Sequence, residues 1–243
     1  MNAKAGGQAE SYPIDGYDWL MKFDPEFETA RRALAAVVWA PERGALPLRI
    51  REILATVALS FMAYPTAETH IRRALAAGAK FREVVEALQT VCVPGGHPCL
   101  HHAMPFLKKI EQEIGDKANE GADAGSSRLA KTAKHALTVW PWMQEHYPAY
   151  EEARGKLTGM MWTPTDPVLA VKYREVCASM ILALRFYPTV PVHMRRALRE
   201  GATFAELVEA VQTVALLAGM PVLHFCLPFL KEIQEEVDSG KFS

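Results

Sequence analysis

The chain has 243 residues, of which 50% are hydrophobic, so it can bury a substantial core. Its 27 Lys and Arg residues balance 28 Asp and Glu residues, which argues against a nucleic-acid-binding surface because such surfaces carry a clustered basic excess. No apolar run approaches the roughly 20 residues that span a bilayer, and the N-terminus lacks the apolar stretch of a secretion signal. We therefore expect a cytoplasmic protein that binds neither membranes nor nucleic acids.

The first half of the chain is predicted to be helical throughout. Residues 47–63 place apolar side chains along one side at helical spacing. Tyr64-Pro65-Thr66 ends this helix, because proline cannot continue a helix and threonine can cap the next one. The predicted helices of this half are one that follows Pro25 and ends near Trp39, then 47–63, 67–77 and 81–93, and a last one that begins near Pro98.

The second half repeats the first. Residues 51–110 align without a gap on residues 174–233, at an offset of 123 positions, and 31 of the 60 aligned residues are identical. A repeat of this length indicates two copies of one structural unit. Between the copies lies a small, polar stretch that is typical of a flexible linker. We predict a first repeat over residues 14–114, a linker over 115–136 and a second repeat over 137–237.

The start of one helix differs between the repeats. Thr203 and Glu206 form a capping box for the predicted helix 204–217, whereas Lys80 removes half of that box in the first repeat. No stretch alternates apolar and polar residues over six positions beside turn signals. The sequence therefore predicts an all-α fold.

The cysteines form neither a CxxC motif nor a zinc-binding pattern, and none has a cysteine counterpart in the other repeat. We predict buried, unpaired thiols rather than disulfides. They are Cys92, Cys99, Cys177 and Cys226.

One histidine in each repeat is predicted to point into the core. Ala67, His70, Ile71 and Ala74 share one helix face, and His193 takes the same place in the second repeat. Imidazole titrates near neutrality, so an inward histidine can act as an acid or a base. A core histidine that bonds a backbone carbonyl is the alternative.

An Arg-Glu pair lies early in the long apolar helix of each repeat, as Arg51-Glu52 and Arg174-Glu175. A glutamate beside the histidine would orient the ring and stabilise its charged form. An arginine could hold a substrate carboxylate by two hydrogen bonds. A solvated ion pair at a helix end is the alternative.

Tyr64 and Tyr187 stand at the break after that helix. Each could donate a hydrogen bond to a substrate or could only fill the turn.

The segment GGHPCLHH at 95–102 looks like a metal-binding cluster, with two histidines one helical turn apart. The second repeat keeps a single histidine of this cluster and has apolar residues at the other positions. We therefore predict no metal in either repeat, and keep a metal site in the first repeat as an alternative. Its ligands would come from His97, Cys99, His101 and His102.

A Gly-x-Pro turn precedes the last helix of each repeat, at Gly96 and Gly219. Free N–H groups at a helix start attract anions, so a substrate carboxylate could dock there. His101 and His224 lie one turn further on and would face the same anion.

The order of these motifs resembles the carboxymuconolactone decarboxylase family, which includes the alkyl hydroperoxidase D-like proteins. The second repeat presents the same order 123 residues later. In the first repeat the order is Arg51-Glu52, an apolar helix, His70, Gly78-Ala79, Glu83 and Gly96-x-Pro98.

The resemblance implies an all-α fold in which the tandem units form a pseudo-dimer within one chain. It also implies a ring-shaped homo-oligomer, here a trimer of two-repeat chains. The peroxidase branch of the family uses a CxxC motif, and Tyr64 and Ala67 stand where its two cysteines belong. A peroxidatic thiol mechanism, which needs a reactive thiolate and a resolving partner, is therefore not expected.

The decarboxylase branch acts on small carboxylated lactones from aromatic-ring breakdown without a metal or organic cofactor. The resemblance implies a cofactor-independent lyase or isomerase for such a metabolite. It makes His70 and His193 the acid/base groups, Glu52 and Glu175 their orienting partners, and Arg51 and Arg174 the carboxylate anchors. The alternatives are a non-catalytic subunit or binding module, and a metal-dependent hydrolase or hydratase that uses the first-repeat histidine cluster.

Overall fold

A computed structural model describes residues 17–40, 44–119, 141–162 and 167–242. Within these residues every regular element is a helix, which confirms the all-α prediction. No described helix is both long and apolar enough to cross a lipid bilayer.

The helices of the two repeats correspond closely. From α2 to α5, the helix bounds recur 123 residues later in α8 to α11. The first repeat holds α1 (Tyr17–Phe23), α2 (Pro25–Trp39), α3 (Leu48–Phe61), α4 (Ala67–Ala76), α5 (Phe81–Gly95), α6 (Pro98–Ile114) and the 3-10 helix η1 (Gly115–Asn119). The second holds α7 (Pro141–His146), α8 (Pro148–Trp162), α9 (Val171–Leu184), α10 (Val190–Arg199), α11 (Phe204–Ala218) and α12 (Met220–Asp238).

The capping difference between the repeats is present as predicted. The Thr203 N–H donates to Glu206 Oε2 at 2.7 Å, and the Glu206 N–H donates to Thr203 Oγ1 at 3.1 Å. In the first repeat the Lys80 N–H donates to Glu83 Oε2 at 2.9 Å. The lysine side chain has no acceptor for the return bond, so only half of the box remains.

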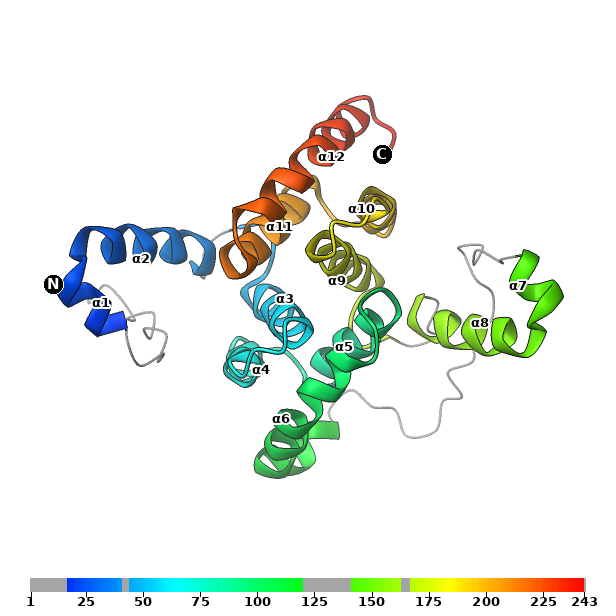
Figure 1. Ribbon diagram of the computed structural model, residues 1–243, viewed down its shortest axis with the longest axis horizontal. Coiled ribbons are helices and arrows are strands. Elements are labelled where there is room, and N and C mark those ends of the chain that lie inside the picture. Colours follow the sequence, from blue (N-terminus) through cyan, green and yellow to red (C-terminus); the bar gives the residue numbers. More distant parts are fainter. Residues whose placement is uncertain (1–16, 41–43, 120–140, 163–166, 243) are drawn as a thin grey trace, which may run out of the picture.

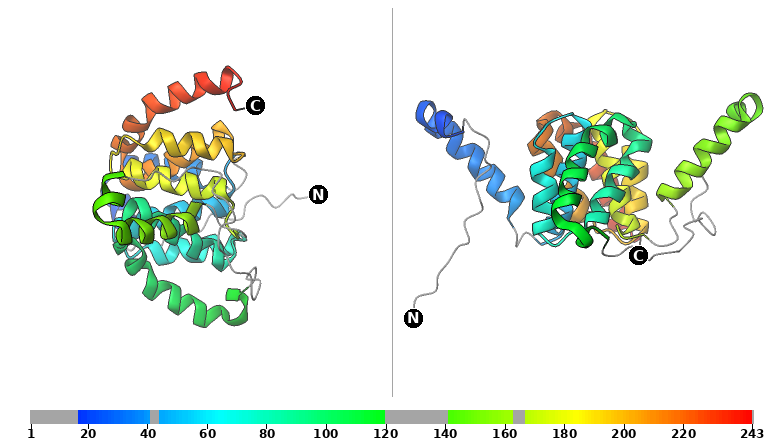
Figure 2. Two further views of the ribbon diagram at one scale, coloured as in Figure 1. Left: turned by 90° about the vertical axis from the view of Figure 1, so that its right-hand side faces the viewer. Right: turned by 90° about the horizontal axis from the view of Figure 1, so that it is seen from below.

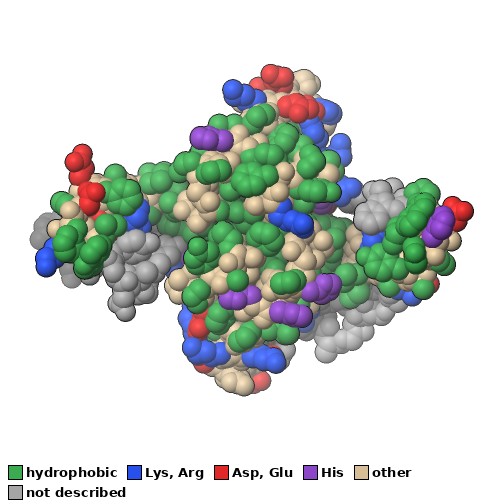
Figure 3. Space-filling view, viewed as in Figure 1, with side chains coloured by type: hydrophobic (Ala, Val, Ile, Leu, Met, Phe, Trp, Pro, Cys, Tyr) green, Lys and Arg blue, Asp and Glu red, His purple; other side chains and the backbone are tan. Residues whose placement is uncertain are grey.

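Two arms project from a central helical bundle. The bundle comprises α3–α6 and α9–α12, and the arms α1–α2 and α7–α8 extend to opposite sides of it (Figures 1 and 2). Hydrophobic side chains are prominent on both arms (Figure 3). Those at least half exposed include Trp19, Phe23, Phe27 and Val37 on one arm and Trp142, Tyr147, Tyr150 and Met160 on the other.

In the bundle, a helix of each repeat packs against the central helix of the other repeat. Helices α3 and α9 lie side by side at its centre (Figure 1). Of the two central helices, α5 packs mainly against α9 and α11 packs mainly against α3. Each central helix is therefore flanked by a helix of the other repeat.

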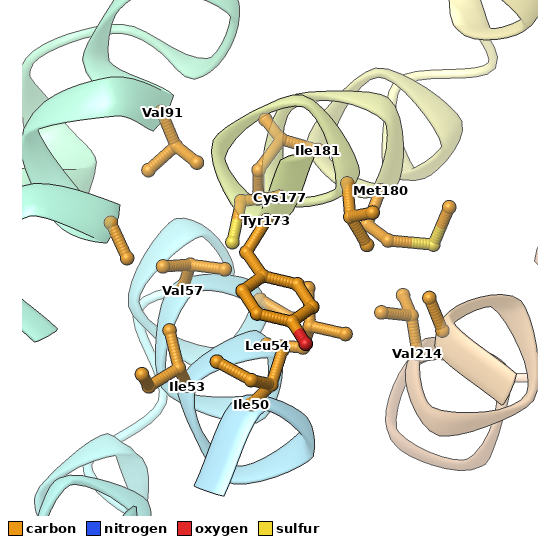
Figure 4. Packing of buried hydrophobic residues seen from close by; sticks show 14 of the residues in the cluster. Ile50, Ile53, Leu54, Val57, Val91, Tyr173, Cys177, Met180, Ile181 and Val214 are labelled. Carbon is orange, nitrogen blue, oxygen red and sulfur yellow. The ribbon is translucent and has the colours of Figure 1, made fainter. Parts of the chain in front are cut away.

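One hydrophobic core runs through both repeats. Figure 4 shows its centre, where side chains of α3 and α9 meet each other and are closed by α5 and α11. Burial of this surface stabilises both repeats together, since each contributes one wall. The labelled residues are Ile50, Ile53, Leu54 and Val57 on α3, Tyr173, Cys177, Met180 and Ile181 on α9, Val91 on α5 and Val214 on α11.

The repeat bounds 14–114 and 137–237 stay a prediction. Of the predicted linker 115–136, the first five residues form η1. The remainder of it, from residue 120, lies outside the described residues.

Two glutamates, the buried Glu86 and the half-buried Glu209, tie the repeats together. Glu86 Oε2 on α5 accepts the Val168 N–H at 3.1 Å and the Leu169 N–H at 2.9 Å, and it pairs with Arg174 Nη2 at 2.5 Å. Its counterpart Glu209 accepts the N–H groups that stand before α3 in the first repeat. These reciprocal contacts fix the start of each central helix on the other repeat.

The four cysteines are buried and form no disulfide, as predicted. Burial raises the pKa of the Cys177 thiol to about 12, and it does the same for Cys99 and Cys226. Burial also raises the pKa of Cys92.

We expect the folded protein to resist alkylation of its thiols. The thiolate is the reactive form, and a pKa of about 12 leaves roughly one thiol in ten thousand ionised at pH 8. Intact-mass spectrometry after iodoacetamide treatment should show no adduct on Cys99, Cys177 or Cys226 in the native protein and four adducts per chain in urea. The native rate should rise as the pH approaches 12. Rapid modification of Cys177 at pH 8 would contradict its burial.

Glu86→Ala should lower the free energy of unfolding by about 3 to 5 kcal/mol, because it leaves the buried Arg174 charge without its carboxylate. Urea unfolding followed by circular dichroism measures this change. Glu152→Ala is the control, since Glu152 and Lys156 form an exposed pair within α8. A Glu86 variant that unfolds at the same urea concentration as the control would refute the role of this contact.

Candidate functional site

The structure places the inward histidine of each repeat beside a glutamate. His70 Nδ1 on α4 lies 2.6 Å from Glu52 Oε2 on α3, and His193 Nδ1 on α10 lies 2.6 Å from Glu175 Oε2 on α9. Both glutamates are almost completely buried. A carboxylate in this position fixes which ring nitrogen carries the proton and stabilises the protonated ring.

A sharp reversal of the chain brings each pair together. Helices α3 and α4 pack along one another, and so do α9 and α10. Ala63 and Phe186, which precede the predicted Tyr-Pro-Thr breaks, have φ values of 59° and 52°. Non-glycine residues seldom adopt this left-handed conformation, so the packing of the two helices must hold it in place.

A tryptophan covers the histidine in each repeat. The ring centroids of Trp39 and His70 are 5.4 Å apart, and those of Trp162 and His193 are 5.2 Å apart. Both tryptophans end an arm helix and are buried. Each tryptophan covers one side of its histidine and shields the bond to the glutamate from water, and a hydrogen bond in such a low-dielectric place is stronger than in water. Trp39 and Trp162 stand 123 positions apart, as the repeats do, but a spacing of 31 residues from the histidine gives no sign of a contact in the sequence.

The two sites differ in the second oxygen of the glutamate. In the first repeat Arg73 Nε lies 2.9 Å from Glu52 Oε1, and the guanidinium carbon lies 5.5 Å from the Trp39 ring centroid. In the second repeat Glu175 Oε1 is buried and has no hydrogen-bond partner among the residues that the structure describes. The His70 side chain is fully buried, whereas 14% of the His193 side chain is exposed.

The predicted carboxylate anchors have a different role. Arg51 is fully buried, and its guanidinium donates to the backbone carbonyls of Leu46, Val38 and Ala40. These bonds tie the end of α2 and the following loop to α3. The interpretation of Arg51 as a substrate anchor is therefore wrong.

Arg174 is occupied in the same way. It donates to the carbonyls of Leu169 and Met161 at 3.1 and 3.3 Å, and it pairs with Glu86 across the repeats. All three guanidinium nitrogens donate within the protein and the side chain is buried, so Arg174 presents no open edge to a substrate carboxylate.

The other predicted binding residues lie nearer the surface. Tyr64 and Tyr187 are about half exposed, and His101 and His224 are exposed in the first turns of the last helices. Within the described residues, no side chain of these four makes a hydrogen bond. Gly96 and Gly219 end α5 and α11 with φ values of 91° and 97°, which glycine adopts without strain.

In the histidine cluster of the first repeat, His102 packs against neighbouring residues. His102 Nε2 lies 3.0 Å from the Tyr64 carbonyl oxygen, and its ring meets Phe106 edge to face. Its counterpart Phe225 meets Phe229 in the same geometry. In the part of the chain that the structure describes, no three His, Cys, Asp or Glu side chains are grouped to hold a metal ion.

Comparison with known proteins agrees with the motifs and the fold. Residues 25–109 match the model of the carboxymuconolactone decarboxylase family. A crystal structure with the same fold is that of a candidate gamma-carboxymuconolactone decarboxylase subunit from Burkholderia xenovorans LB400. The two chains are 26% identical, the match covers 92% of each, and the TM-score is 0.60. No curated protein matches the sequence.

The matched residues contain the complete first site, from Trp39 through Glu52 to His70. The second repeat carries the same pair of side chains at the same separation. Residues 25–109 thus resemble the carboxymuconolactone decarboxylase family in sequence, and the whole chain resembles a decarboxylase-type subunit in fold.

Proposed function

We propose that the chain is a cofactor-independent lyase of the decarboxylase type, or an isomerase, for a small carboxylated metabolite derived from an aromatic ring. The observation that carries this proposal is the buried histidine–glutamate pair, at 2.6 Å in both repeats and covered by a tryptophan. The match of residues 25–109 to the family model and the decarboxylase-type structural neighbour support the same reaction class.

The geometry assigns a separate task to each side of the imidazole. With Nδ1–H donating to the glutamate, the other nitrogen, Nε2, carries the lone pair that can accept a proton from the substrate. The glutamate stabilises the imidazolium that forms. In an isomerisation the same nitrogen returns the proton to a different carbon. In a decarboxylation the electron pair left by departing CO2 takes up a proton from the imidazolium.

A non-catalytic binding subunit is the second candidate function. It is favoured by the first repeat, where Glu52 is bonded on both oxygens and His70 is fully buried. In that case the histidines contribute to stability and not to turnover.

We also propose a trimer of two-repeat chains. Both arms expose aromatic side chains, with Trp19 62% and Trp142 59% exposed in the single chain. Exposed aromatic residues in such numbers are typical of protein interfaces. Two arms per chain at opposite sides of the bundle would let each chain contact two neighbours, as ring closure requires (Figure 2).

His70→Gln and His193→Gln, made singly and together, should separate the two candidate functions. If the histidines are the acid/base groups, the double variant should lose about 10²- to 10⁴-fold in turnover of a responsive substrate from a panel of lactones and cyclic keto acids. Unchanged turnover in the double variant would contradict the acid/base role of the histidines. Lower melting temperatures with unchanged ligand affinity would support the binding subunit.

The same assay addresses the metal-dependent alternative. His97 is exposed at the start of α6, away from the core. We expect His97→Gln to retain turnover. Loss of turnover in His97→Gln, together with its retention in the double variant, would favour a metal-dependent enzyme instead.

Size-exclusion chromatography with light scattering should give a mass about three times the 27.0 kDa of one chain. Trp142→Ser with Tyr150→Ser removes apolar surface from one arm and should shift the mass toward that of a single chain, because ring closure needs both arms. A wild-type protein that stays monomeric at micromolar concentration would contradict the proposed assembly.

A further inference from the structure

The carboxylates of Glu52 and Glu175 have different surroundings, although the two glutamates occupy the same position in the repeat. Glu52 in the first repeat binds His70 with one oxygen and Arg73 with the other. Glu175 in the second repeat binds His193 with Oε2, while its Oε1 has no partner. Among the described residues, Glu175 Oε1 is the only buried carboxylate oxygen without a hydrogen bond.

An unbonded carboxylate oxygen inside a protein costs stability. The oxygen loses its water shell on burial, and no donor of the protein replaces the water. Folded proteins leave few buried polar atoms in this state, and those they retain call for an explanation. The first repeat shows that this fold can satisfy the same oxygen with an arginine. The second repeat does not do so.

The arginine that would satisfy it is present. Arg196 stands 123 residues after Arg73, on the same turn of the corresponding helix α10, three residues after His193. It is partly exposed, and within the described structure it forms neither an ion pair nor a hydrogen bond through its side chain. On a helix, residues three apart lie on the same face, so Arg196 and His193 are neighbours.

We propose that the second repeat binds a small hydroxy-carboxylate, whose hydroxyl donates to Glu175 Oε1 and whose carboxylate pairs with Arg196, and that the first repeat is closed to such a ligand by its own Arg73. This inference rests on the proposed function, because it places that function in one repeat and specifies its substrate class.

The chemistry of the two groups selects this ligand. A carboxylate oxygen only accepts hydrogen bonds, so its missing partner must be a donor. A guanidinium only donates, and its planar fork fits a carboxylate best. The ligand must therefore carry a hydroxyl and a carboxylate close together. Bound in this way it lies next to the partly exposed His193, the proposed acid/base group of the same repeat.

The first repeat excludes the same ligand for a matching reason. Arg73 neutralises Glu52 directly and lies over the Trp39 ring, and His70 has no exposed surface. A ligand would have to break this ion pair before it could reach either group. The first site therefore contributes to stability, and the second takes the ligand.

Isothermal titration of the full chain with mandelate tests this proposal, because mandelate carries a hydroxyl and a carboxylate on one carbon. Phenylacetate lacks the hydroxyl and benzyl alcohol lacks the carboxylate. We expect one mandelate to bind per chain. The dissociation constant of either partial analogue should be at least about tenfold higher than that of mandelate. Arg196→Met should weaken mandelate and phenylacetate about equally. Glu175→Gln should abolish the preference for mandelate over phenylacetate, because an amide N–H at the Oε1 position cannot accept a hydrogen bond from the hydroxyl.

Two variants serve as controls. Arg199→Met removes an exposed charge from the same helix and should leave mandelate affinity within twofold. Arg73→Met should lower the melting temperature and leave the affinity unchanged. Absence of mandelate binding, two equivalent sites per chain, or equal losses in Arg196→Met and Arg199→Met would each overturn the proposal.

This result is separable from the proposed function. If the chain binds mandelate through Arg196 but turns over no substrate, the binding site is supported and the enzymatic function is contradicted. If turnover depends equally on His70 and His193, the enzymatic function is supported and its assignment to the second repeat is contradicted.

Discussion

The pairing of α3 with α9 is the constraint on which the rest of the molecule depends. Each of these helices contains an Arg-Glu pair near its start, and neighbouring residues of an α-helix project about 100° apart. The arginine therefore turns toward the loop before its helix, while the glutamate turns toward the next helix and its histidine. One dipeptide thus fixes both the entry of the chain into the bundle and the orientation of the candidate catalytic group. A displacement of either central helix would disturb both at once.

Buried charge is the cost of this arrangement, and the structure offsets most of it. Arg51, Glu52, Glu86 and Arg174 are all buried, and desolvation of an ionised group is compensated only by close, well-directed partners. Each of the four has such partners, and Glu86 and Arg174 pair with each other across the repeats. Against this background Glu175 Oε1 stands out, since in the described part of the chain every other buried carboxylate oxygen has a hydrogen-bond partner.

The comparison of the repeats shows how far identical residues can diverge. Arg73 and Arg196 occupy the same helical position, and each follows the site histidine by three residues. One forms an ion pair with the glutamate and the other does not. An arginine side chain has several rotatable bonds and can reach different partners from one backbone position, so its contact is decided by its surroundings. Two copies of a motif therefore need not perform the same task.

The sequence by itself determined the helices, the repeat, the inward histidines and the buried thiols. These features follow from local spacing: apolar residues every three to four positions, proline breaks such as Pro65, and caps such as Thr203. The tertiary structure alone decided that Arg174 pairs with Glu86, 88 residues away, that the tryptophans cover the histidines, and that α5 and α11 exchange partners. Such contacts depend on the path of the whole chain, because residues distant in sequence meet only when the helices between them are placed.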